Sequence, residues 1–402
     1  MALPTGLRAF RHANFRRFFA AQLVAQIGSW MQTVAQSWLV LQLTSSPLLL
    51  GLIGTLQFAP ILLFSIVSGA LADRLPKRRL LVLTQTVLGC QALALGALVY
   101  SGHVEYWHVA VLATGVGLAN VLDSPARQSF VAEMVGRSDL SSALSLNSAS
   151  FNAARIVGPS IGGLLIARFG VAPAFVCNGV GFAIAIAVML SLRARGLPQP
   201  RTGAGVVEEI LIGIRYVWRT REMVLALGLC FMVSFCVFNF TVYVPLVVRD
   251  VLGLGAEGFG FLMASLGVGA VSGALTLGTL GSQRPPRPLM FVAAALACGG
   301  LLGLSVVHAF WPAVAMLFVT GFFGIICVVS CNTTMQLAST DALRGRVMSI
   351  YTLVWGGVFP IGAFLVGAMS ERWGVQRALM TNGTIGLIGI AALLGWWRLR
   401  VR

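Results

Sequence analysis

Long apolar runs separated by short polar connections cover almost the whole chain. Twelve runs can be marked off, each close to the roughly 20 residues that an α-helix needs to cross a bilayer. The pattern predicts an all-α membrane protein with twelve transmembrane helices. The runs lie at residues 18–43, 47–71, 80–101, 107–127, 142–167, 172–192, 223–246, 258–281, 289–308, 311–333, 347–369 and 376–397.

The longest polar stretch separates the sixth predicted helix from the seventh and runs from Arg193 to Arg221. Its first part is rich in proline and glycine, and its second part has apolar side chains at helical spacing. We therefore expect an amphipathic helix along the inner membrane surface. The chain is predicted to divide into a six-helix bundle at 1–193, a cytoplasmic linker at 194–221 and a second six-helix bundle at 222–402.

Two short sequences recur at the same offset in the two predicted bundles. SGAL at 68–71 recurs at 272–275, and RFG at 168–170 recurs as RWG at 372–374. Because 272 − 68 and 372 − 168 both equal 204, the matches indicate an internal repeat. Parallel repeats of this kind predict two pseudo-symmetric halves, and transporters with such halves bind their substrate between them near mid-membrane.

Composition and charge strengthen the membrane prediction. The chain is 57% hydrophobic and only 10% charged, whereas soluble domains carry roughly 25% charged residues. With a cytoplasmic N-terminus, the predicted inside segments hold 23 of the 28 cations, the outside loops hold 4, and Arg155 lies within a helix. By the positive-inside rule we expect a multi-pass membrane protein with both termini in the cytoplasm. The net charge of +16 therefore reflects topology rather than nucleic-acid binding.

Polar residues recur every three or four positions along predicted helices one and five, so each set lies on one helix face. Lipid cannot satisfy such groups, so these faces either line a water-filled cavity or hydrogen-bond to other helices. Interhelical bonding is the favoured interpretation for single serines. The cavity is favoured for Gln26, Asn152 and Arg155, and helix one adds Gln22 and Gln36 to this set.

Arg155 lies near the middle of its predicted helix, where a charge is costly unless it meets a partner or water. Its guanidinium suits an anionic or carboxylate-bearing substrate. A structural pair with Asp123 on the neighbouring helix is the alternative. Polar and aromatic residues of the second half are candidates for the opposite wall of the cavity: Asn239, Tyr243, Asn332, Gln336, Tyr351 and Trp355.

The loop after predicted helix two reads GALADRLPKRR at 69–79. It resembles the helix two to three signature of the major facilitator superfamily, although Pro76 stands where the family usually has glycine. The resemblance implies a cytoplasmic gate in which Asp73 caps a helix of the other half and Lys77 pairs with an acid, here Asp123. The candidate gate residues are Gly69, Asp73, Arg74, Lys77, Arg78, Asp123, Arg127, Arg344 and Arg346.

Predicted helix five carries IVGPSIGG at 156–163. The glycines form a small-xxx-small packing face and the proline can bend the helix; these positions are Gly158, Pro159, Gly162 and Gly163. The segment resembles the GPxxGG end of an exporter motif of the superfamily, whose earlier glycines are replaced here by Ser145 and Ala154. Together with DSPAR at 123–127 and RGRVMS at 344–349, it resembles the subgroup that contains enterobactin exporters and macrolide efflux pumps.

The resemblance covers the whole chain and implies a secondary active transporter, a multi-pass protein of a bacterial inner membrane. We expect alternating-access export of an amphipathic organic molecule such as a drug or siderophore, driven by proton antiport. Because no Asp or Glu lies at mid-membrane, Asp123 is the candidate for proton coupling. Uptake by symport, or transport of a lipid or metabolite, is the alternative. The protein is expected to work as a monomer without a cofactor.

Other function classes lack their residues. The four histidines lie near helix ends without catalytic partners at useful spacing, and no phosphate-binding loop is present, so neither an enzyme nor an ATP-driven pump is expected. The seven cysteines all fall within apolar runs, where they are typical packing residues, and no metal site is expected. The repeat and the gate motif disfavour a channel.

Overall fold

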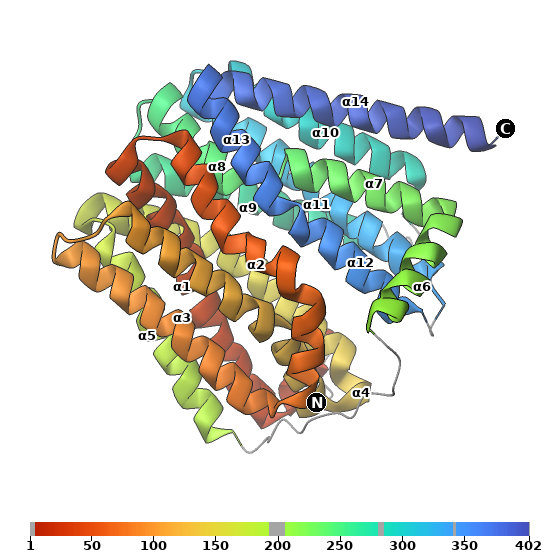
Figure 1. The fold of residues 1–402 in the computed structure, drawn as a ribbon, viewed down its shortest axis with the longest axis horizontal. Helices are drawn as coiled ribbons and strands as arrows, with labels where there is room; N and C mark the ends of the chain where they lie inside the picture. Colours follow the sequence, from red (N-terminus) through yellow and green to blue (C-terminus); the bar gives the residue numbers. More distant parts are fainter. Residues whose placement is uncertain (1–4, 193–205, 280–284, 341–342, 402) are drawn as a thin grey trace. The chain divides into compact units, whose positions relative to one another are not determined.

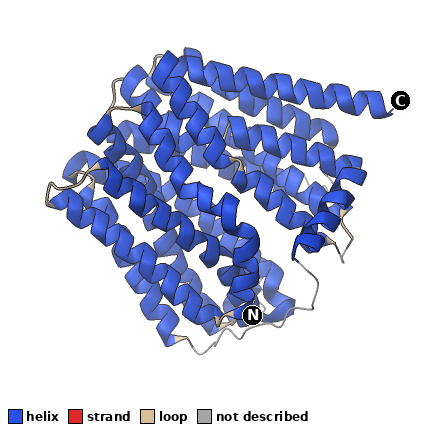
Figure 2. Ribbon diagram, in the orientation of Figure 1, coloured by secondary structure: helices blue, strands red, loops and turns tan. Residues whose placement is uncertain are grey.

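The computed structural model describes residues 5–192, 206–279, 285–340 and 343–401, and helices are the only regular structure in these ranges (Figure 2). The first part of the chain forms a 3₁₀ turn and five long helices: η1 (Thr5–Arg11), α1 (Ala13–Thr44), α2 (Pro47–Arg74), α3 (Lys77–Tyr100), α4 (Tyr106–Phe169) and α5 (Ala172–Ser191).

The second part begins with a short helix and continues with helices that include one π-helical turn, η2. In chain order they are α6 (Val206–Arg219), α7 (Arg221–Cys236), α8 (Phe240–Leu246), η2 (Val247–Val251), α9 (Ala256–Thr279), α10 (Arg287–Val306), α11 (Phe310–Ala338), α12 (Arg344–Gly357), α13 (Phe359–Trp373) and α14 (Val375–Val401). Figure 1 follows this order by colour.

Each predicted span coincides with a helix, with part of one, or with a pair of consecutive helices. Within the described residues, ten helices are long and apolar enough to cross a membrane. The two predicted spans outside this set are α1 and the second part of α4. Both are long enough, so their composition sets them apart, and both carry the polar stripes noted above.

The chain forms two compact units. The first comprises Met1–Thr44 and Ala59–Thr202, and the second comprises Ser45–Phe58 and Gly203–Arg402. The beginning of α2 therefore belongs to the second unit and the remainder of α2 to the first. The division into bundles at 1–193 and 222–402 stays a prediction, and residues 193–205 of the linker lie outside the described residues.

In the first unit, α1 packs against α4 and α5, and α3 packs against the same two helices. Helix α4 is really two helices, because Gly136 interrupts it with a positive φ of 69° that residues other than glycine rarely adopt. Near this break, Phe15, Phe18 and Phe130 are fully or almost fully buried in one apolar cluster with Leu81. The two parts of α4 correspond to the fourth and fifth predicted spans.

Glycines allow the second part of α4 to lie directly on α1. A Cβ atom on Gly158 would stand 2.5 Å from the Cβ of Trp30 and 2.7 Å from the carbonyl oxygen of Ile27. One on Gly162 would stand 3.1 Å from the Cγ of Met31. Pro159 and Gly163 are buried beside them. Close approach of this kind is how helices associate in lipid, where water supplies no force between them.

The second unit uses the same device between α9 and α11. Cβ atoms on Gly269 and Gly321 would stand 2.2 Å from the carbonyl oxygen of Phe318 and 2.1 Å from that of Leu266. These two helices therefore touch backbone to backbone. Helix α10 packs against α11 and α14, and α7 packs against α11, α14 and α10 (Figure 1).

The start of α2 packs on α13 within the second unit. A Cβ on Gly51 would stand 2.5 Å from the carbonyl oxygen of Ala363, and the Thr55 hydroxyl donates to the carbonyl of Pro360 at 2.9 Å. At the first turn, Glu371 accepts a 3.1 Å bond from the backbone amide of Leu48. Its carboxylate thus satisfies an amide that has no partner within its own helix.

The internal repeat is visible as a shared turn. Gly170 follows α4 with a φ of 78° and Gly374 follows α13 with a φ of 82°. Each backbone amide donates at 2.9 Å to the carbonyl four residues earlier. The RFG and RWG sequences therefore end equivalent helices in the same way, because both turns need a residue that tolerates positive φ.

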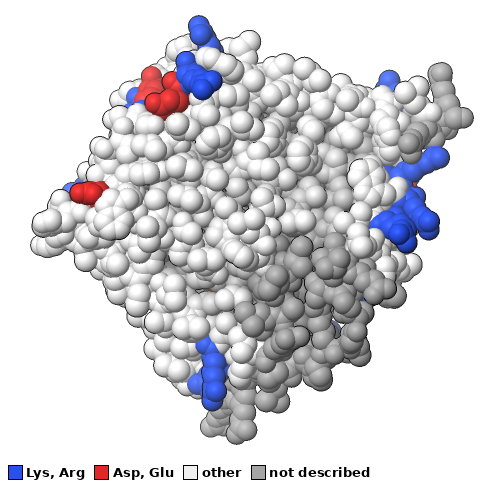
Figure 3. Space-filling view, viewed as in Figure 1, with Lys and Arg blue, Asp and Glu red and all other residues white. Residues whose placement is uncertain are grey.

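Large areas of the surface drawn in Figure 3 carry no charged side chain. The Lys, Arg, Asp and Glu residues of the described chain that this face shows form a few small groups. Exposed large apolar residues such as Leu83, Val111 and Ile388 are 60%, 62% and 64% accessible. Such exposure is costly in water and is what a helix surface in contact with lipid requires.

Replacing Gly158 by alanine should destabilise the packing of α4 on α1. The added methyl overlaps backbone and Trp30 atoms, so we expect a loss of about 1–3 kcal/mol and earlier thermal unfolding of the purified protein in detergent. Gly115→Ala is the matched control in the same helix, because a Cβ there meets nothing within 4 Å and alanine favours helix. Equal unfolding temperatures for the two variants would contradict the close packing.

Candidate functional site

A buried carboxylate joins three helices of the first unit. Asp123 of α4 is 1% exposed and forms an ion pair with Arg127, one turn later on the same helix. Its other oxygen accepts a 2.9 Å bond from the hydroxyl of Thr84 on α3. Arg127 also donates to the side-chain oxygen of Gln22 on α1 at 3.4 Å. The cluster therefore connects α1, α3 and α4 through one charged pair.

The described bonds of Asp123 come from Arg127 on its own helix and from Thr84 on α3. Pairing of Asp123 with Lys77, which the resemblance implies, or with Arg155, the structural alternative, stays a prediction. A cation at i+4 on the same helix reaches an acid without any movement of the helices. Lys77 is 1% exposed at the start of α3, and Arg155 is 6% exposed in the second part of α4.

The other candidate gate residues lie on α2, α3 and α12. Arg78 donates at 2.8 Å to the carbonyl of Met189 and also to that of Leu190, so it satisfies the C-terminal end of α5. Arg344 and Arg346 lie in the first turn of α12. Gly69, Asp73 and Arg74 fall within α2, but their side chains lie outside the described residues.

The polar stripe of α1 contacts the second part of α4. The hydroxyl of Ser150 donates to Gln26 at 3.2 Å, so at this position the interhelical bond is present. Asn152 donates at 2.9 Å to the carbonyl of Ser148 in its own helix, and Gln36 is buried. Gln26, Asn152 and Arg155 remain predicted substrate contacts of the first unit.

Sequence reasoning missed a buried cluster of three amides in the first unit. Asn178 of α5 donates to Gln32 of α1 at 2.6 Å, and Gln32 donates to Gln91 of α3 at 2.9 Å. Gly28 makes room for the cluster, since a Cβ there would stand 2.7 Å from the Asn178 side-chain oxygen. The signal was present as three amides in apolar spans, but Gln32 lies off the face that carries the polar stripe of α1.

Two interrupted helices meet in the second unit. The predicted seventh span breaks between α7 and α8 at residues 237–239, and the eleventh breaks between α12 and α13 at Val358. Phe238 at the first break lies edge-on to Trp355 of α12, with ring centres 4.6 Å apart. Asn239 packs on α13, where a Cβ on Gly362 would stand 2.5 Å from the Asn239 amide nitrogen. The structure thus brings the predicted wall residues Asn239 and Trp355 to one place.

The predicted tyrosines hold backbone carbonyls. The Tyr243 hydroxyl donates at 3.2 Å to the carbonyl of Val237, at the α7–α8 break. The Tyr351 hydroxyl donates at 3.0 Å to the carbonyl of Val328 in α11. The break at 237–239 exposes the Val237 carbonyl, and in lipid such a group must be satisfied by protein or by water in a cavity. Gln336 donates to Asn332 one turn away on α11.

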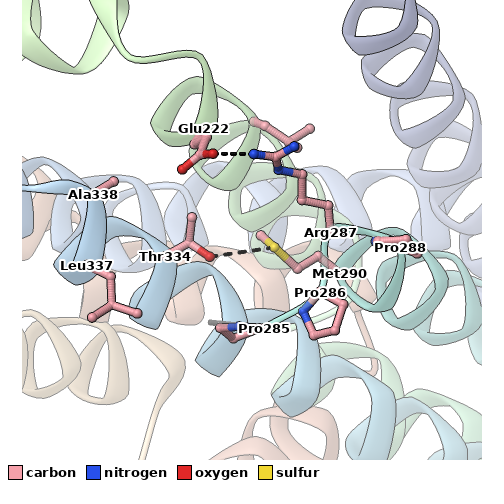
Figure 4. A pocket seen from close by; sticks show the side chains of 10 residues that line it. Glu222, Pro285, Pro286, Arg287, Pro288, Met290, Thr334, Leu337 and Ala338 are labelled. Atoms are coloured by element: carbon pink, nitrogen blue, oxygen red, sulfur yellow. Dashed lines mark hydrogen bonds and ion pairs between the residues drawn. The ribbon is translucent and has the colours of Figure 1, made fainter. Parts of the chain in front are cut away.

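A pocket of about 400 Å³ lies among the ends of α7, α10 and α11 (Figure 4). An ion pair between Glu222 and Arg287 lies at one side, and Arg287 also lies 4.8 Å over the ring of Trp397. Thr334 donates to the sulfur of Met290 at 3.7 Å in the wall. None of the eleven predicted cavity residues lines this pocket within the described chain.

The whole chain from residue 4 to residue 402 matches one family, described as transmembrane secretion effector. This chain belongs to that family. It is accordingly a transporter of the major facilitator superfamily rather than an enzyme, and a multi-pass protein of the bacterial inner membrane that carries a small-molecule substrate. The resemblance noted in the loop at 69–79 and in predicted helix five is therefore confirmed.

Three relatives of this chain align with it along almost their full length. The staphyloferrin A transporter of Staphylococcus aureus is 23% identical over 94% of this chain and 93% of its own. The multidrug efflux pump Tap of Mycolicibacterium fortuitum is 28% identical over 93% of both chains. The enterobactin exporter EntS of Shigella boydii is 26% identical over 95% of this chain and 91% of its own.

The fold agrees with solved transporters. A bacterial homologue of the human lysosomal transporter Spinster, in an inward-facing unoccupied conformation, superposes with a TM-score of 0.76 at 15% identity, over 98% of this chain and 97% of that one. The predicted fold class, an all-α membrane protein with the major facilitator fold, is confirmed. At this identity the likeness concerns the fold alone.

The Asp123–Arg127 pair generates a prediction about stability. Arg127→Gln leaves a buried carboxylate without its cation and should destabilise the protein by on the order of 2 kcal/mol. The double variant Asp123→Asn/Arg127→Gln should recover most of this loss. Thermal unfolding of the purified proteins in detergent measures the loss in Arg127→Gln and its recovery in the double variant.

Arg249→Gln serves as the control for this pair, because its acid, Asp250, is 37% exposed whereas Asp123 is 1% exposed, so the Arg249–Asp250 pair should contribute little. If Arg127→Gln and the double variant were equally unstable, the loss of stability would not come from the unpaired carboxylate of Asp123.

Proposed function

We propose that this transporter exports an amphipathic organic molecule, such as a drug or siderophore, from the cytoplasm by alternating access and proton antiport. The export direction is supported by the family, which is described by secretion, and by relatives that are named as an enterobactin exporter and a multidrug efflux pump. Uptake symport or transport of a lipid or metabolite is the alternative.

The coupling mechanism is carried by the buried pair of Asp123 and Arg127. Protonation of the carboxylate removes the charge that holds Arg127, and in a low-dielectric setting this is a large change in local energy. Arg127 then needs another acceptor, and the Gln22 side-chain oxygen already lies 3.4 Å away on α1. Because Thr84 connects the same carboxylate to α3, one proton alters the bonding of three helices.

We further propose that the substrate contacts polar residues from both units. In the first unit, Arg155 is the candidate partner for a carboxylate or other anionic group, with Gln26, Asn152, Gln22 and Gln36. In the second unit, the meeting place of the two broken helices supplies Asn239 and Trp355, with Tyr243, Tyr351, Asn332 and Gln336. Backbone carbonyls freed at such breaks are suitable polar ligands. The transporter is proposed to function as a monomer.

The direction of transport can be measured in cells with and without the gene, using a panel that contains a lipophilic cationic dye and a catechol siderophore. Export predicts lower accumulation of at least one compound in cells that express the protein. Higher accumulation would support uptake and contradict the proposal. An Arg155→Ala strain run in parallel should lose the effect for anionic compounds first.

The role of Asp123 can be measured in inverted membrane vesicles with an imposed proton gradient and the compound identified in the panel. Asp123→Asn should abolish gradient-driven accumulation, because it removes the titrating group and leaves facilitated exchange at most. Glu133→Gln is the matched control, an acid on the surface of the same helix. Unchanged gradient-driven transport in Asp123→Asn would remove this residue from coupling.

A further inference from the structure

Helix α6 is fixed to the second unit by one of its faces. Gly213 lies against α12, since a Cβ there would stand 3.1 Å from the Cδ1 of Ile350 and 3.2 Å from the Cβ of Arg346. The Tyr216 hydroxyl donates at 3.2 Å to the carbonyl of Ala338, the last residue of α11. Val217, on the same face, is 3% exposed. The orientation of α6 about its own axis is therefore set.

The opposite face of α6 is apolar and uncovered. Leu211, Ile214 and Trp218 are 56%, 36% and 71% exposed, and their spacing of three and four residues places them in one row. We call this row the α6 stripe. Arg215 and Arg219 are exposed directly beside it. An apolar row bordered by cations on a helix that is not itself buried is the pattern of a helix lying in a membrane interface.

The neighbours of α6 place it at the membrane surface. Only Thr220 separates it from α7, which begins the candidate membrane span Arg221–Val251, and its other contacts are the end of α11 and the start of α12. All three spanning segments begin or end at this level. The α6 stripe therefore lies level with the ends of three candidate membrane spans, on the side predicted to be cytoplasmic.

Charge decides which occupant fits this surface. Arg215, Arg219 and the next cation, Arg221, are all exposed. Of the acids near them in sequence, Glu222 is paired with Arg287, and the side chains of Glu208 and Glu209 in α6 lie outside the described residues. Two copies of the stripe facing each other would bring these cations together, which disfavours a dimer through this face. A zwitterionic lipid offers the cations no net charge, whereas an anionic phospholipid does.

We propose that the α6 stripe is a binding surface for anionic phospholipids of the inner leaflet. Leu211, Ile214 and Trp218 lie among the acyl chains, and Arg215 and Arg219 bind the phosphates. Through Gly213 and Tyr216, the lipids hold the inner ends of α12 and α11. This inference concerns lipid binding and does not depend on which molecule is transported.

The apolar part is tested with the full-length protein in nanodiscs made from phosphatidylcholine and increasing fractions of phosphatidylglycerol with brominated acyl chains. Bromine quenches tryptophan at contact, and the difference between wild type and Trp218→Phe isolates one of the nine tryptophans. We expect Trp218 to be quenched at low fractions of the brominated anionic lipid. An unquenched Trp218 would overturn the proposal.

Trp107→Phe is the matched control for this measurement. Trp107 is 57% exposed, but its indole donates to Glu105 at 2.7 Å, so an acid rather than a cation stands beside it. Its quenching should not distinguish brominated phosphatidylglycerol from brominated phosphatidylcholine. If both tryptophans favoured the anionic lipid equally, the preference would not belong to α6.

The charged part is tested with Arg215→Gln/Arg219→Gln. Each cation near an anionic surface favours contact with an anionic lipid over a zwitterionic one by about fivefold. Trp218 quenching in the double variant should therefore lose a preference for phosphatidylglycerol over phosphatidylcholine on the order of 25-fold at low salt. The control Arg372→Gln/Arg377→Gln removes the same amount of charge near the α13–α14 turn. In this control, Trp218 quenching should keep its preference for phosphatidylglycerol. An unchanged preference in the first variant, or nanodiscs that hold two copies joined through α6, would refute the assignment.

Discussion

The hydrocarbon of a membrane contains no water, so each polar group placed there must find its partner in the protein. The described polar bonds follow this constraint, and many of them join one helix to another. Asp123 is held by Arg127 and Thr84, and Arg78 satisfies the end of α5. A polar side chain is costly in lipid when it is unpaired, so a hydrogen bond or ion pair that it makes to a second helix holds the two helices together.

Close packing is the second consequence of a lipid surrounding. Lipid chains are as apolar as leucine, so helices gain little from hiding apolar surface from each other. The glycines at 158 and 162 and those at 269 and 321 bring backbones together where a methyl group would collide. Van der Waals contact between closely packed helices therefore takes the role that the hydrophobic effect has in water. In each unit this contact depends on a few glycine positions where a side chain would not fit.

Hydropathy predicted the spans well because the length of an apolar run is fixed by bilayer thickness. It did not predict the breaks at 237–239 and at Val358, because an interruption of a few apolar residues leaves the average unchanged. The prolines at 245 and 360 were the available signals. The family signature and the positive-inside count depend on short-range sequence, and these led to the family that the comparisons confirm.

The candidate site was harder to predict because it depends on which face of each helix meets which neighbour. The sequence supplied Asp123 and a set of cations, and of that set the i+4 neighbour Arg127 is bonded to it, but hydropathy alone gives no reason to choose among them. The amide cluster around Gln32 escaped notice because it lies beside the stripe rather than on it. Tyrosine hydroxyls that look like cavity groups in sequence are bonded to carbonyls in the structure.

One feature of α2 bears on motion. The helix passes from the second unit to the first between Phe58 and Ala59, and the next residue is Pro60, which lies inside the helix. Proline has no amide hydrogen, so the carbonyl of Leu56 lacks its usual helical donor. One backbone hydrogen bond is thus missing inside α2 at this point, and a helix bends more readily at such a proline than where its bonds are complete.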